Sequence, residues 1–457
     1  MAVGRVISFS VRYRFLIVAL AGLLVGIGVY SVIHLPIDVV PDVTTVQVQI
    51  NTEAPGLGPV EVERLVTYPI ETAMAGIKDV EEVRSLSISA LSQVTVVFKD
   101  RVDIYWARQQ VMERLQIARE RIPSGFGTPT MAPISTGLGE IYQYVVKGEG
   151  RDLYELRTIQ DWLIRFQLLN VPGVVEINSH GGLVKQYQVL VDPNKLVGYR
   201  IPLRQVFESL VANNLNAGGA YIEHVSEKYL VRGVGLVQTM EDIENIIVDV
   251  DPEGTPIYVK NLAEVVIGPE VRYGAVTQDG KGEVVTGMVL MLKGENSRTV
   301  VNRVKKKVEE ITPTLPAGVS IEPFYDRTEL VNHVIRTVIE NLSIGILLVI
   351  GVVMLILGNW VGALIVSIII PLTALFSFAC MYETGISASL MSLGALDFGI
   401  VVDGSVVMVE NIIRRLHHRE PHKGVFETTV EAGREVGRPV IFAIIIIIIV
   451  YLPILSL

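Results

Sequence analysis

Apolar and polar positions divide the chain into a mixed central region and several uniformly apolar runs. The apolar runs cover residues 15–33, 335–357, 363–381, 389–409 and 439 onward. A run of about 20 apolar residues is long enough to cross the hydrocarbon core of a bilayer as a helix. The pattern therefore predicts five transmembrane helices, one near the amino terminus and the others after the central region.

The central region, residues 43–332, has the pattern of an α/β region outside the bilayer. Residues 45–50 alternate apolar and polar positions as a half-buried strand does, whereas residues 103–122 repeat apolar positions at helical spacing. Strand and helix patterns start again after residues 148–150, and residues 214–239 fit neither repeat. We predict two ferredoxin-like sandwiches built from βαβ units, inserted between the first and second transmembrane helices.

The predicted domains are a first helix with its amino-terminal segment, two α/β subdomains, three further spans, a loop and a fifth span. In that order they cover residues 1–34, 35–148, 149–332 with a docking insertion at about 214–239, 333–410, 411–438 and 439–457.

Basic residues indicate how the helices are oriented. Arg5, Arg12 and Arg14 precede the first apolar run, and six arginines and lysines lie in residues 411–438. Because cytoplasmic segments carry the excess of Lys and Arg, both regions are predicted to be cytoplasmic. The α/β region then lies on the opposite side, which in a bacterium is the periplasm.

Composition agrees with a membrane protein and excludes some other classes. Half of the residues are hydrophobic and the formal net charge is −9, which argues against a nucleic-acid-binding protein. The single cysteine, Cys380, excludes a disulfide framework within the chain and a CxxC metal site. No helix-opening phosphate loop is present, so we expect no nucleotide cofactor.

Three acidic residues lie in or at the end of the fourth apolar run: Asp397, Asp403 and Glu410. A charged side chain at bilayer depth costs at least about 2.5 kcal/mol, so such residues face protein or water and are commonly functional. Asp403 and Glu410 fall on nearly the same helix face, roughly 10 Å apart, and Asp397 points about 120° away. We interpret them as a proton-binding site of a transporter; the alternative is pairing with basic groups of neighbouring helices.

An enzymatic alternative is an intramembrane aspartyl protease, in which two aspartates share a proton. That chemistry needs the pair on facing helices, whereas Asp397 and Asp403 are on one helix and diverge around it. We therefore predict a secondary active transporter and no enzyme.

Several motifs are similar to those of one known family. They are LPIDVVPDVT at 35–44, YPIETAMAGIKDVEEVRSLS at 68–87, DIYWARQQVMERL at 103–115 and DFGIVVDGSVVMVEN at 397–411. The chain resembles the N-terminal half of the inner-membrane pump of the resistance-nodulation-division (RND) superfamily, heavy-metal efflux branch (Czc/Cus type). The resemblance implies a multi-pass inner-membrane antiporter, trimeric when complete, docked to a periplasmic adaptor and an outer-membrane channel.

The resemblance also implies roles for residues. The proton-relay acids of the family correspond to Asp397, Asp403 and Glu410, with H⁺ as the coupling ion. The form of the 397–411 motif is similar to that of pumps for divalent zinc, cobalt, cadmium or nickel. A pump for copper, silver or amphiphilic drugs is the alternative.

Metal capture from the periplasmic side requires oxygen and nitrogen ligands. Acids of the family's cleft lie near Glu140 and near Glu176 and His180, which we expect to be metal ligands; the alternative is solvated loop residues. Complete pumps of the family have about twice this length, including a later lysine that partners the acids. We therefore expect that the chain alone does not pump, and a non-transporting fragment is a further alternative.

Overall fold

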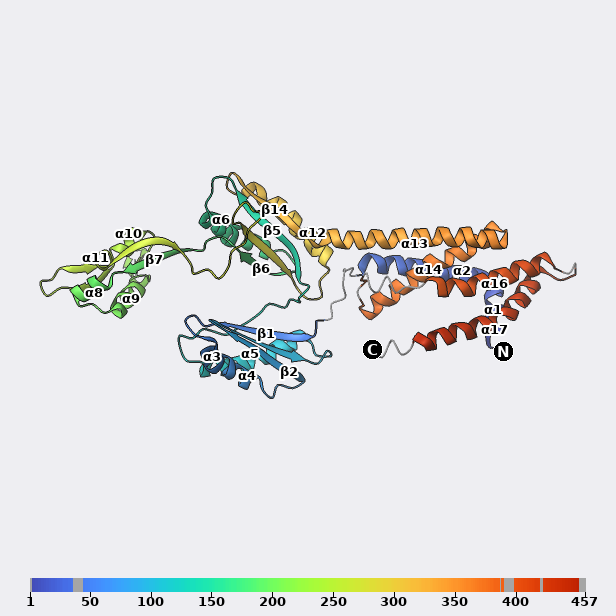
Figure 1. The fold of residues 1–457 in the computed structure, drawn as a ribbon, viewed down its shortest axis with the longest axis horizontal. Coiled ribbons are helices and arrows are strands. Elements are labelled where there is room, and N and C mark those ends of the chain that lie inside the picture. Colours follow the sequence, from blue (N-terminus) through green and yellow to red (C-terminus); the bar gives the residue numbers. More distant parts are fainter. Residues whose placement is uncertain (1, 36–43, 387, 390–397, 420–421, 452–457) are drawn as a thin grey trace.

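The computed structural model describes residues 2–35, 44–386, 388–389, 398–419 and 422–451. Figure 1 shows an elongated molecule, with sheet-containing units toward one end and a group of long helices at the other. Asp397 lies outside the described residues.

The first α/β unit is a four-stranded antiparallel sheet with helices on one face. Its elements are β1 (Val46–Glu53), α3 (Pro59–Val62), η1 (Glu63–Thr67), α4 (Tyr68–Met74), β2 (Val80–Ile88), β3 (Leu91–Phe98), α5 (Ile104–Arg121) and β4 (Thr130–Met131). The strand order is β2-β3-β1-β4, so the unit follows the βαββαβ order of a ferredoxin-like unit.

Helix α5 forms as its periodicity predicts. Asp103 caps it by accepting a 2.9 Å hydrogen bond from the Trp106 amide. Its buried residues are Ala107, Val111, Leu115 and Ala118, which pack into the same hydrophobic cluster as the inward-facing residues of β1 and β3.

The second α/β unit repeats this topology. Its elements are β5 (Glu140–Gly148), α6 (Leu153–Ile159), η2 (Gln160–Ile164), α7 (Arg165–Leu169), β6 (Val174–His180), β13 (Val285–Met291), α12 (Ser297–Ile311), η3 (Thr312–Thr314) and β14 (Val319–Asp326). The strand order β14-β5-β13-β6 is that of the first unit, strand for strand.

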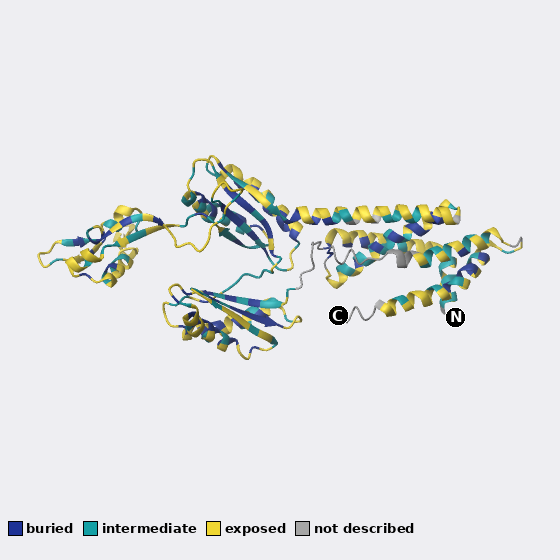
Figure 2. Cartoon of the chain, viewed as in Figure 1, coloured by how far each residue is buried: buried dark blue, intermediate teal, exposed yellow. Residues whose placement is uncertain are grey.

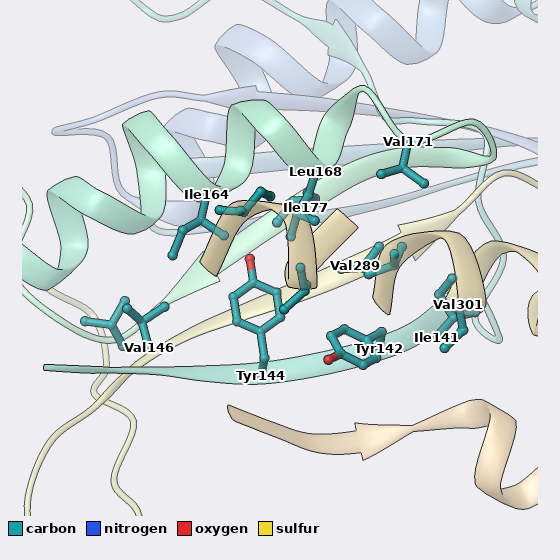
Figure 3. Close-up of a cluster of buried hydrophobic side chains, with 14 of the residues drawn as sticks. Ile141, Tyr142, Tyr144, Val146, Ile164, Leu168, Val171, Ile177, Val289 and Val301 are labelled. Carbon is teal, nitrogen blue, oxygen red and sulfur yellow. The ribbon is translucent and has the colours of Figure 1, made fainter. Parts of the chain in front are cut away.

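One predicted boundary is wrong. Strand β5 pairs with β13 and β14, so residues 140–148 belong to the second sheet and not to a subdomain ending at 148. The glycine-rich turn after β5 is an internal connection of a βαβ unit. Figure 3 shows Tyr144 of β5 pointing toward the helices among the core side chains, and its hydroxyl donates a 3.1 Å hydrogen bond to Gln160.

A third, smaller unit is inserted between β6 and β13. Its elements are β7 (Lys185–Val191), α8 (Pro193–Tyr199), α9 (Leu203–Ala212), β8 (Ala217–His224), β9 (Glu227–Gly233), α10 (Met240–Glu244), β10 (Ile247–Val250), β11 (Pro256–Tyr258), α11 (Val259–Leu262) and β12 (Ala263–Pro269). It has its own hydrophobic cluster. The segment expected as an insertion, 214–239, is mainly the exposed hairpin β8–β9 of this larger unit.

The long helices form the remaining part. They are α1 (Ala2–Arg12), α2 (Arg14–His34), α13 (Arg327–Leu357), α14 (Trp360–Thr384), α16 (Phe398–His417) and α17 (Val425–Tyr451). Among the described residues, three helical segments are long and apolar enough to cross a membrane: Arg14–His34, Arg327–Ile356 and Trp360–Thr384. Figure 2 shows how much of these helices is exposed, as lipid-facing helices are.

The region predicted as a cytoplasmic loop, 411–438, is mostly helical. Helix α16 continues to His417, and α17 begins at Val425, well before Pro439. The two helices continue past their apolar runs because polar contacts hold them together: Arg415 forms an ion pair with Glu435 at 2.9 Å.

Candidate functional site

Helix α16, which carries Asp403 and Glu410, packs against neighbouring helices through two of its faces. Toward α13 and α14, Val406 and Val409 join a hydrophobic cluster that contains Val353 and Val366. This contact fixes the rotation of α16 about its axis.

The second face of α16 lies against α17. A Cβ atom added to Gly404 would lie 3.0 Å from Val440 Cγ1, so the glycine allows a close approach of the two helices. Two turns further along this face, Asn411 is buried, and its amide donates hydrogen bonds to Ala432 O at 2.9 Å and to Glu435 Oε2 at 3.2 Å.

A third face carries the acids. Asp403, Val407, Glu410 and Arg414 are all exposed, and at 100° per residue they form one stripe along α16. Asp403 and Glu410 are seven residues apart, which places them roughly 10 Å apart along the axis. Within the described part of the chain, neither carboxylate has a hydrogen bond or an ion pair. The basic partner considered as an alternative is therefore not found among these residues.

The candidate metal ligands Glu140 and Glu176 lie on the second sheet. Both are paired with Leu290 of β13, Glu140 from β5 and Glu176 from β6. Directly paired residues project to the same face, and strands lie about 4.8 Å apart, so the two backbones are roughly 10 Å apart. The Glu140 carboxylate accepts a 3.1 Å hydrogen bond from Gln143.

His180 does not converge on this pair. It is four residues beyond Glu176 on β6, or about 13 Å along the strand, and it is paired with Thr286. It borders an open cavity of about 630 Å³ together with Met288 and Arg272. Zn²⁺ binds its ligands at about 2.0–2.2 Å, so one ion cannot be bound by both Glu176 and His180 in this arrangement. Among the described residues, no group of three or more His, Cys, Asp or Glu is arranged to hold a metal.

Sequence reasoning missed the polar contact between α16 and α17. Asn411 directly follows Glu410 at the end of the apolar run, and Glu435 lies in the segment that the sequence predicts to be a loop. The available signal was helical spacing: Ala432 and Glu435 are three residues apart, on one face of a helix.

Comparisons with known proteins agree on a family. The AcrB/AcrD/AcrF family profile matches residues 6–457. The chain is 50% identical to "Cobalt-zinc-cadmium resistance protein CzcA" of Cupriavidus metallidurans and 38% identical to "Cation efflux system protein CusA" of Escherichia coli K12. In each case the alignment covers 99% of this chain and 44% of the relative.

A solved structure of a heavy metal efflux pump (crystal form II) superposes with a TM-score of 0.87 at 35% identity. The superposition covers 99% of this chain and 44% of that one. The chain thus spans a little under half the length of the relatives that it matches.

Proposed function

The chain belongs to the AcrB/AcrD/AcrF (RND) family, and on that premise we propose that it is the N-terminal half of a proton-driven antiporter for divalent heavy-metal cations. The observation that carries the proposal is the acidic stripe of α16. Two carboxylates project from a helix face that the described helices of this chain leave open, while the other two faces are packed.

Proton coupling needs carboxylates that change their proton affinity between two surroundings. Loss of water and approach of a cation change that affinity in opposite directions. A helix that covers the stripe with a basic side chain in one state, and withdraws it in another, would supply both surroundings. A membrane potential of 100 mV then contributes about 2.3 kcal/mol per charge moved. We propose Asp403 and Glu410, with Asp397, as the relay.

We propose that the α/β units face the periplasm of a Gram-negative cell and that the long helices lie in its inner membrane. Helix α13 follows β14 directly, and Asp326 caps it by accepting a 2.8 Å hydrogen bond from the Thr328 amide. Movement of α13 would therefore be transmitted to the second sheet, on which Glu140 and Glu176 lie. The complete pump would be a homotrimer that works with a periplasmic adaptor and an outer-membrane channel.

Divalent zinc, cobalt, cadmium or nickel is the proposed substrate class, with H⁺ as the coupling ion. Support comes from the two carboxylates, Glu140 and Glu176, on one face of the second sheet and from a relative whose name states cobalt, zinc and cadmium resistance. Carboxylate oxygens suit such ions better than they suit copper(I) or silver, which prefer thiolate and thioether ligands.

The test is growth of a host without its own heavy-metal pumps on graded Zn²⁺, Co²⁺, Cd²⁺ and Ag⁺. The chain is expressed alone and together with a second half that completes the pump. We expect zinc, cobalt or cadmium resistance only from the completed pump. Resistance only to silver or to amphiphilic drugs would show that the proposed substrate class is wrong. No resistance at full expression would favour a non-transporting fragment.

A further inference from the structure

Helix α1 lies against the first half of α17, far from the α/β units. A Cβ atom added to Gly433 would lie 2.9 Å from Ile7 Cγ2, and one added to Gly437 would lie 2.7 Å from Ile7 Cδ1. The spacing Gly433-x-x-x-Gly437 therefore forms the groove that receives α1. Arg434, between them, donates hydrogen bonds to Gly4 O at 3.3 Å and Ser8 Oγ at 2.7 Å.

The opposite side of α1 is amphipathic and exposed. Val6 and Phe9 on this side are 63% and 49% exposed, and Arg5 and Arg12 lie along one edge of it. Helices with apolar residues on one side and arginines beside them lie in the interface of a membrane. Figure 1 shows α1 turned away from the axis of α2, which starts at Arg14.

A basic cavity opens where α1 meets α17. It has a volume of about 420 Å³ and is lined by Val3, Gly4, Arg5, Arg434 and Arg438. Arg434 uses its guanidinium to hold α1, as described above. Arg5 and Arg438 have no ion pair or side-chain hydrogen bond within the described part of the chain.

We propose that this cavity binds the phosphodiester headgroup of an anionic phospholipid. Arg438 directly precedes the apolar run of α17, and α1 directly precedes α2, so the cavity lies at the boundary of the hydrocarbon core. Arg5 and Arg438, which the described residues leave unpaired, provide beside an interfacial helix the positive charge that an anionic headgroup requires. The exposed Val6 and Phe9 lie beside the acyl chains of the same leaflet. The proposal is independent of transport.

A free phosphate would satisfy the same arginines, and the interfacial position of α1 favours the lipid. The test is native mass spectrometry of the full chain, released from detergent, with phosphatidylglycerol, phosphatidylcholine or inorganic phosphate. We expect retention of one phosphatidylglycerol, with neither phosphatidylcholine nor inorganic phosphate competing for it.

The variant R5Q/R438Q should weaken phosphatidylglycerol binding about thirtyfold. The matched control R232Q/R419Q removes the same charge from exposed residues that do not line the cavity and should change binding little. Melting temperatures of all variants are measured in parallel. Similar values are expected because neither pair of arginines has an ion pair or side-chain hydrogen bond to lose among the described residues. Equal losses in the two double variants, equal binding of phosphatidylcholine, or displacement by inorganic phosphate would each overturn the proposal.

Discussion

The amide nitrogen of Asn411 lies 3.2 Å from a carboxylate oxygen of Glu435 and joins α16 to α17 at the end of the acidic stripe. Arg415 donates to both oxygens of the same carboxylate, at 2.9 Å each. Asn411 is 4% exposed, so its amide has no ready replacement partner in water. This contact fixes the position of α16, and hence of Asp403 and Glu410, relative to α17.

Replacing Asn411 with Ala should lower the melting temperature of the detergent-solubilised chain. The change leaves Ala432 O without its side-chain donor and opens a gap, which costs about 1–3 kcal/mol. Asn213→Ala, which removes an exposed amide bonded within its own helix, is the control. Equal melting of the two variants would show that the contact contributes no stability.

Asp403→Asn should abolish metal resistance of the completed pump without changing its melting temperature. The amide has nearly the same volume but cannot take up or release a proton. The exposed carboxylate of Asp403 has no partner to lose among the described residues. Glu410→Gln and Asp397→Asn should impair resistance less uniformly. Glu427→Gln, an exposed acid in the first turn of α17, should not impair it. Normal resistance in Asp403→Asn at equal protein level would refute the relay.

The ion pair of Lys305 with Asp326 should make stability depend on pH. Burial alone would raise the pKa of Asp326, but hydrogen bonds from Lys305 and Thr328 outweigh it and hold the pKa below 3.8. A depressed carboxyl pKa contributes stability that is present above the unfolded value and lost as pH falls through the folded value.

Lys305→Met should therefore melt below wild type at pH 7, and the difference should close as pH falls below about 4. Lys307→Met, which breaks an ion pair with the exposed Glu310, should have little effect at any pH. If the melting temperature of Lys305→Met stays below that of wild type by the same amount down to the lowest pH, the lost stability comes from packing of the lysine side chain and not from the ion pair.

Glu140→Gln and Glu176→Gln should each weaken zinc or cobalt resistance of the completed pump. Both acids flank Leu290 on one sheet face, so their carboxylates can approach one ion. The double variant should then lose less than the sum of the single losses, because residues that share a ligand are coupled. His180 lies on the same strand as Glu176 but about 13 Å away, so His180→Gln should leave zinc resistance unchanged if the site consists of the two acids alone. Full zinc resistance in the double variant would show that neither acid takes part in zinc transport.

Cysteines at Glu149 and Arg419 in a Cys380→Ser background should be labelled from opposite sides of the membrane. Both positions are exposed: Glu149 follows β5 of the second α/β unit, and Arg419 follows the end of α16. Glu149 is preferred to its neighbour Gly150, whose φ of 73° disfavours a side chain. Reaction of both with an impermeant reagent in intact spheroplasts would contradict the predicted topology.

Local periodicity was sufficient for much of the fold. The stripe of α5 was visible in sequence because each buried residue recurs at helical spacing, and Asp103 and Pro123 delimit it. The shared face of Asp403 and Glu410 follows from the same geometry. By contrast, the assignment of β5 to the second sheet depends on pairing with β13, more than a hundred residues later, and no local pattern encodes that register.

Packing between distant segments explains what was missed at the ends of the chain. Residues 2–12 contain Gly4, Ser8 and Ser10, which have low helix propensity, so their sequence predicts only a basic segment before the first apolar run. Packing against α17 stabilises this helix. The first turns of α17 contain several charged residues, so the apolar pattern of the sequence does not mark where α17 begins. Glu176 and His180 lie on one strand, β6, so their spacing of four residues already implies a separation of about 13 Å.

The chain enters and leaves the third unit at a single place, since Lys185 at the start of β7 is paired with Pro269 at the end of β12. A segment whose two ends are adjacent can be exchanged, enlarged or deleted without moving the strands that flank it. Evolution can thus alter the distal unit, hairpin included, while the sheet with Glu140 and Glu176 stays unchanged. For protein engineering, residues 185–269 are a natural cassette for grafting between relatives.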